Sequence, residues 1–241
     1  MVARDLKVKY KHTALGYLWS LLNPILQLAI MGTVFSHVVK WQTKDYTLFL
    51  FSGFLVWTFF STSLNLGAYC FIENEHFIRK IYLPMPLFPL SKVVFRLIDF
   101  LFSLVALSLL AFVLGYSLHS TMFYLPPATF LLFFFVLGIS MVAAVMTVFF
   151  RDMQYLITVA LQMLYFVSPI LYPITMMPEK IRFVLQMNPL CAYLTLFQRI
   201  IYEGVPPTLM EWGMASGVTA ISMAAGFLVL AYNDHKLVYR L

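Results

Sequence analysis

The 241-residue sequence is 62% hydrophobic and only 11% charged, and its mean hydropathy is +0.87. A soluble domain carries charges on about a quarter of its residues, so this composition excludes a soluble globular protein and places most of the surface in lipid. The net charge of +6 does not indicate nucleic-acid binding, because the Lys and Arg residues lie between apolar stretches, where they set membrane topology.

Basic and apolar residues alternate in the N-terminal segment 1–14. As a helix, this segment places Leu6, Tyr10 and Ala14 on one face, and its lysines can reach anionic lipid headgroups. We therefore predict an amphipathic interfacial helix over 1–14. The alternative is a plain positively charged flank of the first span.

Charge-poor runs predict six membrane-spanning helices, each long enough to cross a hydrocarbon core of about 30 Å. Both termini then lie on one side of the membrane. Eleven Lys and Arg residues fall on that side against five on the other, which favours cytoplasmic termini. The fold class is thus an all-α polytopic membrane protein, a single transmembrane domain over 1–241, with predicted spans 15–39, 46–72, 97–115, 127–150, 153–175 and 211–233.

Among the acidic residues, Asp99 is the one that lies well inside a predicted span. An ion in the membrane suggests a functional residue. Asp99 is also one helical turn from Arg96, so the simpler interpretation is an ion pair near the cytoplasmic interface. Both interpretations remain open from the sequence.

The inner loop 73–90 mixes both signs of charge with Phe77 and Ile78 and then reaches three prolines, beginning at Pro84. This pattern predicts a short amphipathic helix on the cytoplasmic side, whose exposed apolar residues need a protein partner. The alternative is an ordinary interfacial loop.

Prolines also interrupt the region after the fifth span. Ser168-Pro169 and Tyr172-Pro173 predict the end of that helix, and Asn188-Pro189 breaks the apolar stretch 183–198. Non-helical backbone at membrane depth survives only where protein or a wet cavity surrounds it. We predict a re-entrant helical hairpin over 176–204 that forms an outer plug or gate.

Aromatic residues make up 17% of the chain and occur along the spans, not only at the interfaces. Many such side chains face lipid or pack between helices. Tyrosine hydroxyls need partners away from lipid, and ring faces suit the apolar faces of sugars. The predicted substrate-channel residues are Tyr17, Trp19, Phe35, Trp57, Phe59, Phe60, Tyr69, Tyr155, Tyr165 and Phe166.

Signatures of catalysis and of metal binding are missing from the sequence. It has neither G-x-x-x-x-G-K-[ST] nor G-x-G-x-x-G. The five histidines are not at metal-ligand spacing, and Cys70 and Cys191 fall near opposite faces, which argues against a disulfide. We therefore expect neither catalytic nor metal-binding residues, and we expect any energy for transport to come from a partner.

A set of spaced motifs runs along nearly the whole chain. They are Arg4-Asp5-Leu6-Lys7-Val8-Lys9-Tyr10-Lys11, Leu15-Gly16, Leu18-Trp19, Asn23-Pro24, Phe77-Ile78-Arg79-Lys80, the segment 84–89, Arg151-Asp152, Ser168-Pro169-Ile170, Tyr172-Pro173 and Asn188-Pro189-Leu190. In this order they resemble the type-2 ABC exporter permeases for polysaccharides, the family of O-antigen, capsule and teichoic-acid export permeases. The lead before Arg4 is shorter than is usual in that family.

The resemblance implies a homodimer in the bacterial inner membrane with two copies of a separate ATPase subunit, which would use ATP and Mg. This chain would hold no cofactor and would export a lipid-linked, O-antigen-like polysaccharide. The resemblance assigns an ATPase-coupling role to Glu73, Asn74, Phe77, Ile78, Arg79, Lys80 and Pro84. It assigns gating to Arg4, Asp5, Lys7, Tyr10, Pro169, Pro173, Asn188 and Pro189.

Two other functions remain open at this point. A type-2 ABC exporter of small hydrophobic molecules or drugs would share the scaffold, with less need for tyrosines at many depths. An integral-membrane glycosyl- or acyltransferase would need a catalytic cluster of polar groups, which the sequence does not show.

Overall fold

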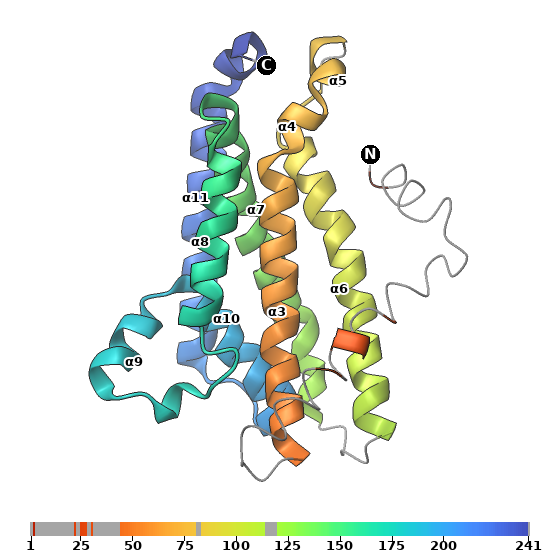
Figure 1. Cartoon of the computed structure of the whole chain (residues 1–241), viewed down its shortest axis with the longest axis vertical. Helices are drawn as coiled ribbons and strands as arrows, with labels where there is room; N and C mark the ends of the chain where they lie inside the picture. Colours follow the sequence, from red (N-terminus) through yellow and green to blue (C-terminus); the bar gives the residue numbers. More distant parts are fainter. Residues whose placement is uncertain are drawn as a thin grey trace.

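The computed structural model describes residues 44–80, 83–113 and 120–240, with isolated positions 2, 22, 25–27 and 30 before them. These residues form helices and connecting turns, with no strand among them (Figure 1). The first predicted span, 15–39, and the predicted interfacial helix, 1–14, lie outside the described residues apart from those isolated positions. In chain order the elements are α3 (Lys44–Ala68), α4 (Cys70–Glu73), α5 (Glu75–Lys80), α6 (Leu87–Val113), η1 (Ser120–Tyr124), α7 (Leu125–Phe149), α8 (Met153–Val167), η2 (Ile174–Met176), α9 (Glu179–Gln186), α10 (Pro189–Gln198), η3 (Arg199–Glu203) and α11 (Leu209–Arg240).

Four helical segments among the described residues are long and apolar enough to cross a membrane: Tyr46–Ala68, Leu87–Phe112, Ser120–Phe149 and Leu209–Asp234. Each overlaps one predicted span. The six-span topology stays a prediction, because the first span is not described and the fifth is short.

The helix at the fifth predicted span, 153–175, is shorter than expected. α8 ends at Val167 after 15 residues, which is about 22 Å of helix against a core of about 30 Å. Ser168 has an extended backbone, with ψ of 142°, because the following Pro169 disfavours a helical conformation there. The chain continues beyond Val167 as turns up to η2.

The helix at the third predicted span begins before that span. The sequence placed its start at residue 97, after Lys92 and Arg96, whereas α6 begins at Leu87. The charges do not end the helix because they are paired: Lys92 contacts Glu73, and Arg96 contacts Asp99 at 3.1 Å. The interpretation of Asp99 as the partner of Arg96 is thus confirmed.

α3 and α7 form the centre of the bundle. In their most apolar windows 67% and 61% of residues are buried, against 28% for α6 and 22% for α11. α8 is also peripheral, since Leu161 is its one buried residue. Because α6, α8 and α11 expose apolar side chains, lipid or another copy of the chain must cover them.

Glycines allow α7 and α11 to touch through their backbones. A Cβ atom added to Gly138 would lie 2.4 Å from the backbone of Ser222, and one added to Gly226 would lie 2.7 Å from the carbonyl oxygen of Gly138. Small residues are the usual means by which membrane helices approach this closely. This contact sets where α11 lies against the centre.

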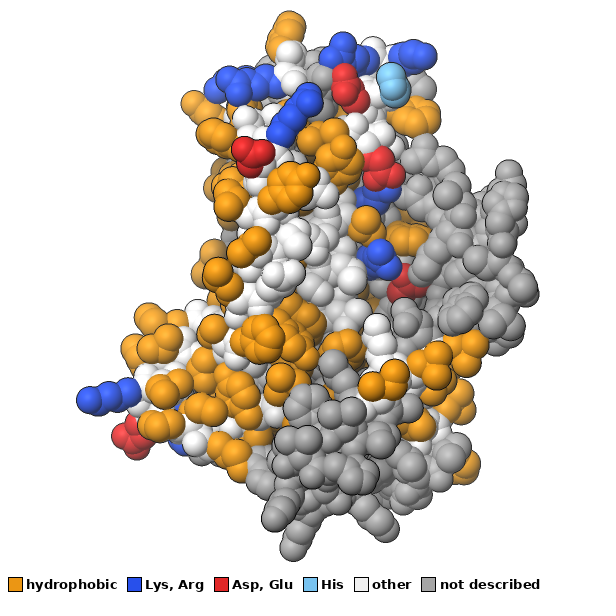
Figure 2. Space-filling model, viewed as in Figure 1, with side chains coloured by type: hydrophobic (Ala, Val, Ile, Leu, Met, Phe, Trp, Pro, Cys, Tyr) orange, Lys and Arg blue, Asp and Glu red, His pale blue; other side chains and the backbone are white. Residues whose placement is uncertain are grey.

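The two ends of the bundle differ in charge. α5, the α7–α8 turn and the C-terminus lie at one end, and α9 and α10 at the other (Figure 1). Lys and Arg side chains gather at the α5 end in the face shown in Figure 2. The described basic residues at that end include Arg79, Lys80, Arg151, Lys236 and Arg240.

Candidate functional site

Polar side chains form a stripe along one face of α3. Thr58, Ser61, Thr62 and Asn65 follow the three-and-four spacing that places residues on one side of a helix. They are partly exposed, although α3 lies within the bundle. They are not among the predicted site residues, although their spacing within a charge-free span was an available signal.

α8 carries a matching stripe. Gln154, Thr158 and Gln162 recur every four residues, and the Thr158 hydroxyl donates a hydrogen bond of 3.2 Å to Oδ1 of Asn65. We call these seven residues of α3 and α8 the polar stripe. It joins α3 to α8.

Hydrogen bonds within each helix make this polarity tolerable in a membrane. Thr62 Oγ1 donates to the carbonyl of Thr58 at 2.6 Å and Asn65 Nδ2 to that of Ser61 at 3.0 Å, while the single proton of Thr158 Oγ1 is shared between Asn65 Oδ1 and the carbonyl of Gln154 at 2.9 Å. The donors of Thr62, Asn65 and Thr158 thus bond within the protein. The hydroxyl and amide oxygens keep acceptor capacity for a polar ligand.

The predicted channel aromatics fall into two sets. Phe59 and Phe60 are buried inside the chain, with ring centroids 5.1 Å from Phe100 and 5.9 Å from Phe135 respectively. Trp57 is also buried, and its ring lies 5.3 Å from Tyr165 on α8.

The second set is exposed and borders the polar stripe. Tyr155 is 76% exposed and Phe166 is 69% exposed on α8, and Tyr69 is exposed at the end of α3. Tyr165 is partly exposed between the two sets. Tyr17, Trp19 and Phe35 lie outside the described residues. The channel role of all ten stays a prediction.

The predicted coupling segment, 73–90, contains one short helix, α5, between the end of α4 and the start of α6. Tyr69 and Asn74 bound α4, whose residues Cys70 and Phe71 are buried, and the Phe71 ring lies 5.8 Å from Phe88 of α6. α4 is therefore anchored in the bundle, and α5 projects from its end (Figure 1).

Charged side chains lie on α5 and at its base. Glu73 Oε2 lies 2.9 Å from the ammonium of the buried Lys92, and Glu75 pairs with Arg79 at 2.8 Å on the surface of α5. Lys80 is exposed and Phe77 is 43% exposed, whereas Ile78 is buried. These features suit a surface that docks another protein.

The buried polar and turn residues hold the coupling segment in shape. Asn74 is buried, and its Nδ2 donates to the carbonyl of Cys70 at 2.8 Å. The carbonyl of Pro84 accepts a bond of 3.0 Å from the amide of Leu87 at the start of α6.

The region 176–204 contains the expected break at Asn188-Pro189. Asn188 caps α10: its Oδ1 accepts a bond of 3.0 Å from the amide of Leu190, and its Nδ2 donates to Ser168 Oγ at 3.0 Å. α10 is largely buried, with Tyr193 donating from its hydroxyl to the carbonyl of Ala215 at 3.0 Å. α9 exposes most of its side chains.

Two side chains fasten the non-helical turn after α8. Gln198 Nε2 donates to the carbonyl of Pro169 at 2.9 Å, and the Tyr46 hydroxyl donates to that of Leu171 at 2.8 Å. Of the predicted gate residues, Pro169, Pro173, Asn188 and Pro189 thus lie in one hydrogen-bonded region at the α9 end. Arg4, Asp5, Lys7 and Tyr10 lie outside the described residues.

Within the part of the chain that the structure describes, no three His, Cys, Asp or Glu residues are grouped to hold a metal ion. Cys70 and Cys191 are buried and unbridged. They lie on α4 and α10, at opposite ends of the bundle.

Comparison with known proteins adds a family assignment to this geometry. A family model described as "ABC-2 type transporter" matches residues 1–202. An O-antigen export system permease protein RfbA of Klebsiella pneumoniae is 32% identical over 205 residues, covering 84% of this chain and 78% of that protein. The protein of the same name in Myxococcus xanthus is 32% identical over 207 residues, covering 84% and 79%. The polysialic acid transport protein KpsM of Escherichia coli is 25% identical over 242 residues, covering 98% and 92%.

Proposed function

Because this chain belongs to the ABC-2 type transporter family, we propose that it is the membrane subunit of an ATP-driven exporter that moves a lipid-linked polysaccharide out of the cytoplasm. The observation that carries this proposal is the polar stripe of α3 and α8 with exposed aromatic rings at its border. Amide and hydroxyl oxygens can accept hydrogen bonds from sugar hydroxyls, and the rings can stack on sugar faces. The names of the relatives supply the glycan class.

A second copy of this chain would enclose the stripe. α8 exposes Tyr155, Met163 and Phe166, and apolar side chains next to a polar stripe suit a protein interface better than lipid alone. A symmetric dimer would place two polar stripes around one path. We therefore propose a homodimer in the bacterial inner membrane.

The α5 end would face the cytoplasm and the ATPase. The Lys and Arg side chains at the α5 end (Figure 2) agree with the positive-inside rule. α5 would dock on an ATPase subunit, one for each copy of this chain, and ATP and Mg would bind there. The hydrogen-bonded region at the α9 end would then be the outer gate.

A transport assay with a matched control tests this function. The purified chain is reconstituted with its ATPase, and release of labelled glycan is measured for each ATP hydrolysed. Asn65→Leu removes the amide that accepts the bond from Thr158 and should lower glycan export several-fold. Asn233→Leu is the control, because the Asn233 amide donates to the carbonyl of Val229 at 2.8 Å on α11, as that of Asn65 does to Ser61 on α3. It should leave export unchanged.

Other outcomes would point elsewhere. Equal export by the Asn65→Leu and Asn233→Leu variants would remove the polar stripe from the mechanism. ATP-dependent transport of a hydrophobic dye with no glycan release would indicate the drug-exporter alternative. Turnover of a glycosyl or acyl donor by this chain without any ATPase would indicate a transferase.

A further inference from the structure

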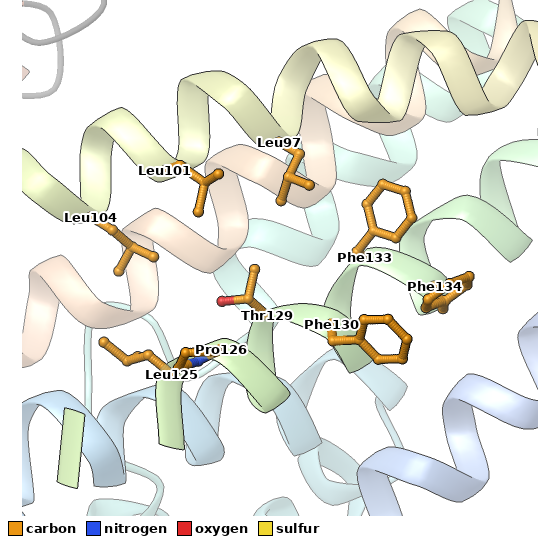
Figure 3. A pocket seen from close by; sticks show the side chains of 9 residues that line it. All are labelled: Leu97, Leu101, Leu104, Leu125, Pro126, Thr129, Phe130, Phe133 and Phe134. Atoms are coloured by element: carbon orange, nitrogen blue, oxygen red, sulfur yellow. The ribbon is translucent and has the colours of Figure 1, made fainter. Parts of the chain in front are cut away.

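A groove opens between α6 and α7 on a part of the bundle that the polar stripe does not use (Figure 3). Its volume is about 440 Å³. Leu97, Leu101 and Leu104 form one wall, spaced so that they share one face of α6. Pro126, Thr129 and Phe130 belong to the wall on α7.

Aromatic packing within α7 keeps this space open. The rings of Phe130 and Phe134 meet edge to face at 4.6 Å, and those of Phe133 and Phe134 at 5.2 Å. The phenylalanines therefore pack on one another instead of filling the gap to the leucines of α6. The groove results from the positions of two helices and not from a missing side chain.

The chemistry of the lining excludes water as a stable occupant. Among the described residues that line the groove, Thr129 is the one with a polar side chain. A buried water needs two to four polar partners. An empty groove would forfeit dispersion contacts along its walls, so a hydrocarbon ligand is favoured.

The length of the groove along α7 matches the thickness of one membrane leaflet. It begins at Leu125 and Pro126, at the end of α7 away from α5, and reaches Phe134, a rise of about 14 Å. This is roughly half of a hydrocarbon core of about 30 Å. The exposed Phe123 and Tyr124 directly precede it, as aromatic residues do at a membrane interface.

We propose that this groove binds one acyl chain of a membrane phospholipid from the leaflet at the α9 end. Leu101, 46% exposed, lies at its open side, and the buried Thr129 lies deeper. The headgroup would lie near Phe123 and Tyr124. This inference requires only that α6 and α7 lie in a bilayer, so it is independent of the exported substrate.

Photo-crosslinking tests the site on the full chain. The protein is reconstituted in vesicles of phosphatidylethanolamine and phosphatidylglycerol with a trace of phosphatidylethanolamine carrying a diazirine in one acyl chain. It is then extracted into mild detergent, which exchanges loosely held lipid, before irradiation. We expect label on peptides containing Leu101 and Phe130 and little on Leu228, which is more exposed on α11.

Groove-filling variants distinguish a site from general lipid contact. Thr129→Trp places an indole in the groove and should abolish the label at Leu101. Leu101→Trp fills the groove from the α6 wall and should abolish the label at Phe130. It replaces Thr129→Trp in this test if that variant does not fold. Leu109→Trp, at an exposed α6 position outside the lining, should leave the groove label unchanged.

Two results would overturn the proposal. Label that follows side-chain exposure and ignores the groove-filling variants would mean ordinary lipid contact. No groove label, together with disulfide trapping of Leu101→Cys to a cysteine placed in residues 1–43 or in a second copy, would identify protein as the occupant.

Discussion

The ammonium of Lys92 lies 2.9 Å from Oε2 of Glu73, and this ion pair joins α6 to the end of α4. The Lys92 side chain is 6% exposed and that of Glu73 is 43% exposed, so the two ends of the pair differ in their access to water. This ion pair and the Phe71–Phe88 contact connect α4 to α6. A movement of α5 would therefore be transmitted through α4 to α6.

The first prediction uses this asymmetry. Glu73→Gln removes the carboxylate beside a buried ammonium, whereas Lys92→Met leaves a carboxylate that water can solvate. We expect Glu73→Gln to lower Tm in detergent more than Lys92→Met does. Glu75→Gln is the control: its pair with Arg79 is at the surface, where such pairs contribute about 0–1 kcal/mol. The reverse order of Tm losses would contradict this account.

The second prediction concerns the glycine contact of α7 and α11. Gly138→Ala forces a Cβ into the Ser222 backbone and should destabilise the protein by about 1–3 kcal/mol, the usual cost of overpacking. Gly217→Ala on α11 meets nothing within 4 Å and should be neutral or slightly stabilising. Resistance to denaturation in mixed micelles measures both. Equal effects would show that the close approach does not hold the helices together.

A third prediction separates the buried from the exposed aromatics. Phe60→Ala removes a ring that is 5% exposed and stacked on Phe135, so it should cost about 3–5 kcal/mol of stability. Tyr155→Ala should leave the stability of the isolated subunit unchanged while reducing dimer formation or glycan export. Thermal unfolding and crosslinking of reconstituted protein check the two effects. A stable, export-deficient Phe60→Ala variant would instead place Phe60 in the channel.

A fourth prediction addresses the turn after α8. Gln198→Leu keeps most of the side-chain volume but removes the bond to the Pro169 carbonyl, so the turn should open more readily. We expect a faster leak of a small trapped dye from proteoliposomes without ATP. Tyr46→Phe, which removes the bond to Leu171, should act in the same direction, and Asn233→Leu should not. An unchanged leak in both turn variants would exclude this region as a barrier.

The sequence alone predicted the class of fold and several local features. The shortage of charge requires lipid around the helices, so a polytopic helical protein follows from composition. Local chemistry also determined the break at Asn188-Pro189 and the Arg96–Asp99 pair, because both depend on residues within one or two helical turns. The motifs that resemble the polysaccharide exporters agree with the family that comparison identified.

Only the tertiary structure decided which side chains meet across helices. Trp57, Phe59 and Phe60 are neighbours in sequence, and whether they face a channel or the core depends on where α6, α7 and α8 lie. The start of α6 was missed because Lys92 is neutralised by Glu73, which is 19 positions earlier in the chain. The meeting of the two halves of the polar stripe could not be predicted for the same reason: Asn65 and Thr158 are 93 residues apart and become one surface only when α3 and α8 pack antiparallel.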